Sequence, residues 1–336
     1  MPETIRVVVT DFLEPDFDWE REQLARYPHV EYVECQLKHA AVAELAEAVK
    51  GAHVLVVNMA PINAEVIAAT TCCGLIIRHG IGYNNVDTAA ATAKGIRVAN
   101  VPDYCDQEVA EQTITLAIAV SRAIGQQMES FVAGVEAGAW QPQIVPKLYS
   151  LGKQTMGLFG LGRIGYQVHK RASAIFGKVI VSDPYLSEAK QKELGVPCVD
   201  AETVLAEADV ISLHMPLTDA TRHFINAEKI AKMKDGARIV NTSRGGLIDV
   251  AALADAIKSG NLAGAGIDVF DQEPPAPDYP LLGLDNVILT PHLGWYSEDS
   301  AWTIREKILG DIVRFVNGKP PRFCVNPDVE DVLKGP

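Results

Sequence analysis

The sequence predicts an α/β protein built from two doubly wound parallel-sheet domains. Short apolar runs alternate with Ala-rich helical stretches along almost the whole 336-residue chain, and such a βαβα order favours a parallel sheet. Most of the apolar runs are continuous rather than alternating, which is expected of strands that helices cover on both faces. A chain of this length corresponds to two domains of ordinary size.

The composition argues against several other classes of protein. Hydrophobic residues make up 48% of the chain and charged residues 22%, which is atypical of disordered, coiled-coil or collagen-like sequences. The net charge of −13 repels phosphate backbones, so we expect no nucleic-acid partner. No apolar run reaches the roughly 18 residues of a membrane span. The opening residues Met1–Thr4 resemble no secretion segment, and we therefore expect a cytoplasmic protein without a membrane partner.

Cysteine and histidine spacing predicts neither disulfides nor a metal site. None of the six cysteines stands in a C-x-x-C pair, and a chain of this size can bury a core without cross-links. We interpret Cys105 as a small buried residue rather than a catalytic thiol. The histidines other than His292 show no paired spacing suited to a metal.

The strand candidates are apolar runs rich in β-branched residues. They include Arg6–Thr10, Val54–Asn58, Leu75–Arg78, Met156–Phe159, Val179–Ser182, Val210–His214, Arg238–Asn241, Gly266–Val269 and Val287–Leu289. Helical composition and spacing mark stretches between them, such as Ala40–Val49, Tyr166–Phe176 and Ala251–Lys258.

Two longer helical patterns suggest where the domains divide. One runs from Asp106 to Ile124 and stops before Gly125, and the other begins near Ser297, a plausible N-cap, and continues to Val316. Each would be about 27–30 Å long, enough to join two domains. We predict a discontinuous substrate-binding domain, residues 1–102 and 295–336, around an inserted nucleotide-binding domain, residues 103–294.

A glycine-rich turn predicts a dinucleotide site. Gly160, Gly162 and Gly165 form G-x-G-x-x-G directly after an apolar strand. The first glycine permits the tight turn, the second lets the backbone approach a pyrophosphate, and the third lets the next helix pack closely. The N-terminus of that helix would present N–H groups to the phosphates.

Asp183 predicts NAD rather than NADP as the cofactor. It ends the next apolar strand, 23 residues after Gly160, where a carboxylate can accept hydrogen bonds from ribose hydroxyls. The same carboxylate would repel a 2′-phosphate, and no Arg or Lys follows directly in Asp183-Pro184-Tyr185. A Gly-rich turn beside an unrelated surface aspartate is the alternative interpretation.

Three polar residues follow three further apolar strands. They are Arg244, Glu273 and His292. Because the carboxyl ends of parallel strands share one edge of the sheet, where ligands of open α/β folds bind, these side chains could converge beside a nicotinamide. Taken singly, each could instead be an ordinary surface or capping residue.

The chemistry of these three side chains suits hydride transfer to a 2-oxo acid. The Arg244 guanidinium can hold a carboxylate in a planar fork. His292 can donate a proton to the carbonyl oxygen and withdraw it in the reverse reaction. Glu273 beside His292 would favour the imidazolium and orient the ring, while the cofactor carries the redox chemistry.

At this point the sequence resembles the D-isomer-specific 2-hydroxyacid dehydrogenases over nearly its whole length. The matching segments are Arg78-His79-Gly80-Ile81-Gly82, Asn85-Val86-Asp87, Gly160 to Gly165, Asp183, His214-Met215-Pro216-Leu217-Thr218, Thr242-Ser243-Arg244-Gly245, Asp268-Val269-Phe270, Glu273-Pro274 and Pro291-His292.

The resemblance implies a Rossmann domain inserted in a flavodoxin-like domain, with the active site in an interdomain cleft and dimers formed through the nucleotide-binding domain. It implies Arg244 as substrate-binding, His292 as acid/base and Glu273 as its partner, and it places the backbone of Ile81 and Gly82 on the substrate carboxylate. It also implies cofactor contacts along the matched segments. These are Thr113, Gly160, Gly162, Arg163, Ile164, Gly165, Asp183, Met215, Pro216, Thr242, Ser243, Arg244, Asp268, His292 and Gly294.

Two departures from the common family pattern bear on the branch. Asn84-Asn85 stands where the family commonly has Asp-Asn, so the hydrogen bonding of that loop can differ. Trp295 follows His292-Leu293-Gly294 and looks like the C-terminal binding protein branch, whose members include NADH-binding transcriptional corepressors. A tryptophan there would offer a flat apolar wall to the substrate, or serve only interdomain packing.

The leading hypothesis is therefore an NAD-dependent dehydrogenase that interconverts a small 2-oxo acid and its D-2-hydroxy acid and that forms a homodimer. One alternative is an NADH-sensing scaffold with little turnover. Another is an NADPH-preferring glyoxylate or hydroxypyruvate reductase. The sequence leaves the substrate side chain and the physiological direction open.

Overall fold

The structure is a computed structural model that describes residues 4–139 and 147–334. The chain divides into two compact units, here called unit 1 and unit 2. Unit 1 comprises the chain up to Tyr104 together with the residues from Glu298 onward, and unit 2 comprises Cys105–Ser297. Each unit contains one parallel sheet between helices, which confirms the predicted fold class.

Unit 1 contains a five-stranded sheet in the order β2-β1-β3-β4-β5, with all pairs parallel. Its strands are β1 (Ile5–Val9), β2 (Val30–Glu34), β3 (Val54–Val57), β4 (Leu75–Arg78) and β5 (Arg97–Ala99). Its helices are α1 (Asp18–Leu24), α2 (Val42–Ala48), α3 (Ala64–Ala69), α4 (Thr88–Ala93), α12 (Glu298–Val316) and α13 (Val329–Lys334).

Both faces of this sheet are buried, which explains its continuous apolar strands. Val7 and Val9 of β1 belong to the core that includes Ile308 of α12, whereas Val8 belongs to the core that includes Leu45 of α2. Successive side chains of a strand point to opposite faces. A strand covered on both sides therefore needs an apolar residue at every position.

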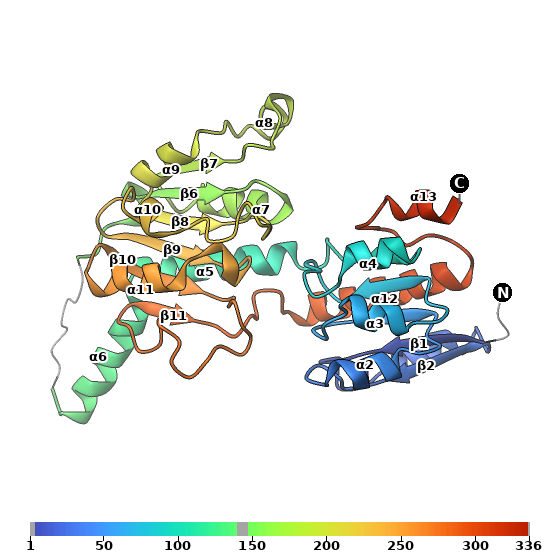
Figure 1. Cartoon of the computed structure of the whole chain (residues 1–336). Helices are drawn as coiled ribbons and strands as arrows, with labels where there is room; N and C mark the ends of the chain where they lie inside the picture. Colours follow the sequence, from blue (N-terminus) through green and yellow to red (C-terminus); the bar gives the residue numbers. More distant parts are fainter. Residues whose placement is uncertain (1–3, 140–146, 335–336) are drawn as a thin grey trace. The chain divides into compact units, whose positions relative to one another are not determined.

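Unit 2 contains a six-stranded parallel sheet in the order β11-β10-β9-β8-β6-β7 (Figure 1). Its strands are β6 (Thr155–Phe159), β7 (Lys178–Ser182), β8 (Val210–Leu213), β9 (Ala237–Asn241), β10 (Leu262–Ile267) and β11 (Val287–Leu289). Its helices are α5 (Asp106–Ser121), α6 (Ile124–Glu136), α7 (Arg163–Ala172), α8 (Glu188–Leu194), α9 (Ala201–Glu207), α10 (Ala227–Ile230) and α11 (Val250–Lys258), with 3₁₀ turns at Leu151–Lys153 and Gly245–Leu247.

Strand order locates the ligand edge of this sheet. The chain places β7 on one side of β6 and then continues on the other side from β8 to β11, so the order reverses between β6 and β8. Helices α5 and α7 pack on one face, and α9, α10 and α11 pack on the other. Ligands of doubly wound sheets bind at the carboxyl ends of the strands, at the point where the order reverses.

The first long helix is shorter than the sequence predicts. Helix α5 ends at Ser121, not at Ile124, and Ala123 adopts a left-handed backbone with φ of 51°. The buried side chains of Arg238 and Asn286 donate hydrogen bonds of 3.1 and 3.2 Å to the carbonyl of Val120. These donors satisfy the end of α5, and the chain restarts as the unpredicted helix α6.

The second long helix follows its prediction closely, since α12 covers Glu298–Val316. The units divide at the first residues of the two helices, so that α5 belongs to unit 2 and α12 to unit 1. Among the described residues, no helix combines the length and the apolarity needed to cross a bilayer.

Candidate active site

The glycine turn lies where the order of the unit 2 strands reverses. Gly160 follows β6 with φ of +97°, and a Cβ there would lie 2.5 Å from the carbonyl oxygen of His214, the residue after β8. A Cβ on Gly165 would lie 2.3 Å from the Gly160 carbonyl. Only glycine therefore permits this close packing of strand, turn and helix.

Gly162 faces open space, unlike the other two glycines. It is the N-cap residue of α7 and makes no side-chain cap, and a Cβ built on it meets no atom within 4 Å. A ligand can therefore approach the Gly162 backbone and the first N–H groups of α7, which belong to Arg163 and Ile164. This open cradle fits the pyrophosphate of a dinucleotide.

Asp183 lies beside the turn, directly after β7. Its Oδ2 accepts a hydrogen bond of 2.8 Å from the backbone N–H of Leu161, and its Oδ1 accepts one of 3.0 Å from Tyr185 N–H. These bonds fix the carboxylate against the glycine turn. Each carboxylate oxygen has lone pairs left over, so the position fits a ribose-binding acid.

Several residues predicted at the nicotinamide end meet one another. The Thr113 and Thr242 hydroxyl oxygens are 2.7 Å apart and both residues are buried. The Ser243 hydroxyl donates to the carbonyl of Leu213, the last residue of β8, at 2.6 Å. Met215 and Pro216 follow β8 next to the His214 carbonyl that limits Gly160. These contacts therefore connect the loops after β6, β8 and β9 with one another and with α5.

Asp268 organises the loop that carries His292. Its carboxylate is 1% exposed and accepts hydrogen bonds from the N–H groups of Leu293 (3.1 Å) and Gly294 (2.8 Å) and from the Thr290 hydroxyl (2.5 Å). A Cβ on Gly294 would lie 2.8 Å from the carboxylate. Asp268 is therefore positioned to hold this loop in place.

His292 and Glu273 form a direct pair. The Nδ1 atom of His292 lies 2.9 and 2.8 Å from the two Glu273 carboxylate oxygens. The backbone of His292 is left-handed, with φ of 56°. With Nδ1 on the carboxylate, Nε2 is the nitrogen that can face a substrate.

The surroundings of Glu273 keep it ionised. Burial opposes its negative charge, but hydrogen bonds from His292 and from the N–H of Phe270, together with the positive charge of Arg244, outweigh burial and lower the pKa of Glu273. An ionised carboxylate accepts a hydrogen bond from Nδ1–H and so fixes the orientation of the His292 ring.

Arg244 lies near this pair at the carboxyl end of β9. Its carbonyl accepts a hydrogen bond of 2.8 Å from the Asn241 amide, and its Nη1 donates one of 2.6 Å to the Ser243 carbonyl. A Cβ on Gly245 would lie 2.1 Å from the backbone of Phe270. The loop of Arg244 and the loop leading to Glu273 are therefore in tight contact.

In unit 1, the Ile81–Gly82 loop presents backbone donors. The carbonyls of Gly80 and Ile81 accept hydrogen bonds from Val101 N–H (3.0 Å) and from the Asn100 amide (2.7 Å). Within the described part of the chain, the N–H groups of Ile81 and Gly82 donate no hydrogen bond. A pair of such N–H groups suits a carboxylate.

Asn85 performs a structural role next to this loop. Its amide donates hydrogen bonds of 3.1 and 3.0 Å to the carbonyls of Asn58 and Ala60.

Two further residues singled out from the sequence are Cys105 and Trp295. Cys105 is 1% exposed at the start of α5. Trp295 is half-buried, with its ring edge-to-face on Tyr296 at 5.4 Å between centroids.

Two polar residues that organise these edges were not identified from the sequence. Asp11 follows β1 and binds backbone N–H groups of the loop after β3. Thr290 follows β11, donates to Asp268 and accepts from the Gln112 amide at 3.1 Å. Both are polar residues at strand ends, the signal that identified Arg244 and His292. Within the described ranges, no group of three His, Cys, Asp or Glu could hold a metal ion.

Comparison with known proteins gives consistent matches. Residues 114–294 match the family model described as the NAD binding domain of D-isomer specific 2-hydroxyacid dehydrogenase. The chain is 43% identical to the hydroxypyruvate reductase of Thermotoga maritima, over 79% of this chain and 85% of that protein. It is 40% identical to the D-3-phosphoglycerate dehydrogenase of Archaeoglobus fulgidus, over 82% of this chain but only 52% of that protein.

A solved structure extends the likeness to the fold. The D-lactate dehydrogenase of Aquifex aeolicus, in complex with NAD and lactic acid, is similar with a TM-score of 0.83 at 29% identity. The match covers 95% of this chain and 99% of that one.

Proposed function

We propose that this chain, which belongs to the D-isomer-specific 2-hydroxyacid dehydrogenases, reduces a small 2-oxo acid to its D-2-hydroxy acid with NADH and catalyses the reverse oxidation. The observation that carries this proposal is the His292–Glu273 pair, 2.8 Å apart, on the strand-end loops of the sheet that also carries the glycine turn. A proton donor and a dinucleotide cradle on one sheet edge suit carbonyl reduction.

The proposed mechanism assigns a task to each side chain. The glycine turn and Asp183 would hold a dinucleotide, which when bound would supply the hydride for C2 of the oxo acid. Arg244 holds the substrate carboxylate and orients the carbonyl group. His292 donates the proton on Nε2 to the carbonyl oxygen, and Glu273 stabilises the imidazolium that holds this proton beforehand. In the oxidation direction, neutral His292 accepts the hydroxyl proton at the same nitrogen.

In this proposal the remaining site residues bind the substrate or the dinucleotide. The backbone N–H groups of Ile81 and Gly82 contact the carboxylate, and Trp295 offers an apolar wall to the substrate side chain. The dinucleotide is held by the glycine turn, by Asp183 and by the nicotinamide-end residues. The latter are Thr113, Met215, Pro216, Thr242, Ser243, Asp268 and Gly294.

Consumption of NADH with a panel of 2-oxo acids tests the proposal. We expect steady loss of NADH with glyoxylate, hydroxypyruvate or pyruvate, and a D-configured product wherever C2 becomes chiral. Saturable NADH binding without turnover on the whole panel would contradict the proposal and favour a dinucleotide-sensing scaffold.

We propose NAD as the preferred cofactor because the Asp183 carboxylate is fixed beside the glycine turn, where it would repel the 2′-phosphate of NADPH. Asp183→Ala should lower affinity for NADH by roughly tenfold to a hundredfold, the size of a lost charged hydrogen bond, and should affect NADPH less. Titration with each cofactor measures the ratio of the NADH and NADPH affinities. Asp200→Ala, which removes a helix cap elsewhere in unit 2, is the control. An unchanged NADH/NADPH ratio in Asp183→Ala would remove Asp183 from cofactor selection.

We also propose a homodimer formed through α6. Met128, Val132 and Val135 lie on one side of this helix and are 65%, 54% and 60% exposed, and none of the helix's residues is buried. In Figure 1, α6 extends away from the unit 2 sheet. A second copy presents the same apolar stripe, as a two-fold interface requires.

Val132→Asp should shift the mass in solution from about twice 36.3 kDa to that of one chain, because it buries a charge in an apolar contact. Light scattering after size-exclusion chromatography measures this mass. Ser130→Asp, on the opposite side of the helix, should leave the dimer intact. A dimer that survives Val132→Asp would contradict this interface.

A further inference from the structure

We propose that the substrate carries a single anionic group, the carboxylate of the 2-oxo acid, and that a phosphorylated 2-oxo acid is discriminated against. This inference rests on the proposed function and narrows it, since the relatives include both a hydroxypyruvate reductase and a D-3-phosphoglycerate dehydrogenase. It is carried by the charges at the carboxyl edge of the unit 1 sheet, where the Ile81–Gly82 loop lies.

The loops around Ile81–Gly82 lack the cations that a phosphate requires, and the one lysine in the loops of this edge, Lys38, follows the outer strand β2. The loops that follow β1, β3, β4 and β5 span residues 10–17, 58–63, 79–87 and 100–105, and none of them contains Lys or Arg. Their carboxylates are Asp11, Glu14, Asp16, Asp87 and Asp103. Phosphate sites in proteins characteristically contain Arg or Lys.

One group of backbone N–H donors at this edge already binds an anion of the protein itself. The Asp11 carboxylate, 1% exposed, accepts hydrogen bonds from the N–H groups of Asn58 (3.2 Å), Met59 (2.6 Å) and Ala60 (3.2 Å). Successive N–H groups of this kind could otherwise bind a phosphate. Here the Asp11 carboxylate already accepts the hydrogen bonds of these N–H groups. Its fixed negative charge lies where a phosphate would otherwise bind.

The donors that remain suit one carboxylate. The N–H groups of Ile81 and Gly82 lie on a loop whose carbonyls are bound by Val101 and Asn100. Arg78, the last residue of β4, adds one positive charge beside them, because its guanidinium lies against Gly80 and donates to the carbonyl of His79. Unit 1 therefore contributes one cation and one pair of N–H groups to the carboxylate that Arg244 of unit 2 also binds in the proposed function.

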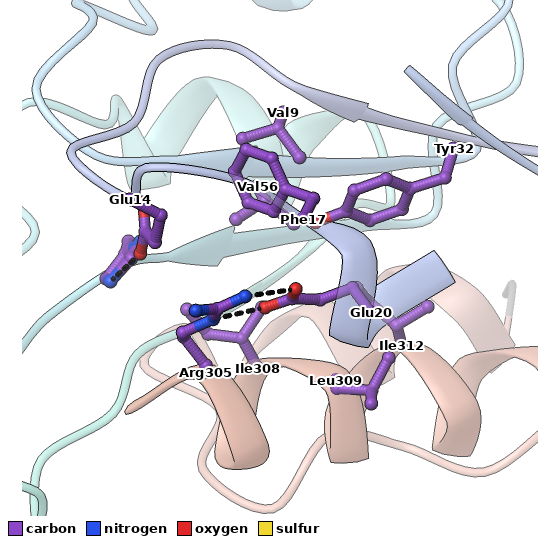
Figure 2. Close-up of a pocket in the computed structure, with 11 residues that line it drawn as sticks. Val9, Glu14, Phe17, Glu20, Tyr32, Val56, Arg305, Ile308, Leu309 and Ile312 are labelled. Atoms are coloured by element: carbon purple, nitrogen blue, oxygen red, sulfur yellow. Dashed lines mark hydrogen bonds and ion pairs between the residues drawn. The ribbon is translucent and has the colours of Figure 1, made fainter. Parts of the chain in front are cut away.

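Other basic side chains near this edge pair with carboxylates. Arg305 lies 2.6 Å from Glu20, and Lys307 lies 2.6 Å from Asp103. His79 lies 3.2 Å from Glu14. Figure 2 shows one small pocket that is lined by the Arg305–Glu20 pair and by Glu14, the partner of His79.

This pocket offers no room for a phosphate. Its volume is about 10 Å³, which corresponds to about one water molecule. Burial lowers the pKa of His79 despite the neighbouring Glu14, so the imidazole is neutral at neutral pH and adds no positive charge. The fixed charge around the Ile81–Gly82 donors therefore opposes a second, dianionic group on the substrate.

A comparison of hydroxypyruvate with 3-phosphohydroxypyruvate tests the inference, because the two substrates differ only in the phosphate. We expect kcat/KM of the wild-type protein with NADH to be higher for hydroxypyruvate by about tenfold or more. Equal or faster turnover of the phosphorylated substrate would overturn this inference while upholding the proposed function. No turnover of any 2-oxo acid would overturn both.

The variant Asp11→Asn isolates the fixed charge that the argument invokes. It keeps an acceptor for the N–H groups of the Asn58–Ala60 loop and removes the negative charge, so the preference for hydroxypyruvate should fall severalfold. Asp18→Asn, an exposed residue of α1, is the matched control and should keep the wild-type ratio. An Asp11→Asn protein with native circular dichroism and an unchanged ratio would contradict the role of Asp11, and the wild-type comparison decides the inference if that variant does not fold.

Discussion

Replacing His292 by asparagine should lower kcat for 2-oxo acid reduction by about 10²–10⁴-fold, the usual contribution of a positioned general acid. The asparagine amide can hydrogen bond to the carbonyl oxygen but cannot transfer a proton to it. Asparagine also tolerates the left-handed backbone of position 292, where φ is 56°. The loss should therefore appear in the chemical step, measured as kcat with saturating NADH.

His223→Asn is the matched control for this prediction. His223 is exposed and also has a left-handed backbone, with φ of 50°, so the same substitution is made in the same conformation. We expect wild-type kcat from the control and nearly unchanged NADH affinity from both variants. A His292→Asn protein with wild-type kcat would remove His292 from proton transfer.

Replacing Arg244 by alanine should lower kcat/KM for the 2-oxo acid by roughly 10²-fold or more, because the carboxylate anchor that orients the carbonyl group is lost. We expect KM to rise and kcat to fall together. Steady-state kinetics with varied 2-oxo acid at saturating NADH separates the two parameters.

Arg244→Lys sharpens this test because it keeps the positive charge and removes the planar fork. It should recover only part of the lost kcat/KM. Arg222→Ala, which removes an exposed arginine from the same unit, should behave like the wild type. Normal KM and kcat in Arg244→Ala would contradict the carboxylate clamp.

Much of the fold could be predicted because the strands are buried on both faces. The apolar run of β4 was predicted to the residue, at Leu75–Arg78, and that of β8, Val210–Leu213, was predicted to within one residue. The edge strand β2 lacks that signal, since Glu31 and Glu34 interrupt its half-buried sequence. Sequence patterns detect burial on both faces more readily than a strand at the edge of a sheet.

The end of α5 could not be predicted, because it depends on residues far away in the sequence. No sequence signal ends a helix at Ser121. Besides the N–H of Ala123, the Val120 carbonyl accepts hydrogen bonds from Arg238 and Asn286, which lie 118 and 166 residues later in the chain. The next helix, α6, likewise has no tertiary core of its own within the described residues. Long-range contacts of this kind leave no mark in local periodicity.

The contact between two of the candidate residues could be predicted from one rule, namely that polar residues following parallel strands share an edge of the sheet. That rule brought His292 together with Glu273, and the structure places their side-chain atoms in hydrogen-bond contact. The support around the pair follows from three-dimensional packing instead. Examples are the hydrogen bonds that the Asp268 carboxylate accepts from Leu293 and Gly294, and those that Asn85 donates to the Asn58 and Ala60 carbonyls.

The most direct test of the central claim is a crystal structure of the protein with NAD and oxamate, an unreactive isostere of pyruvate. We predict the pyrophosphate at Gly162, the ribose at Asp183, the oxamate carboxylate on Arg244, and His292 Nε2 within hydrogen-bond distance of the oxamate amide or carbonyl group. A dinucleotide bound away from the glycine turn, or oxamate out of reach of both Arg244 and His292, would contradict the account.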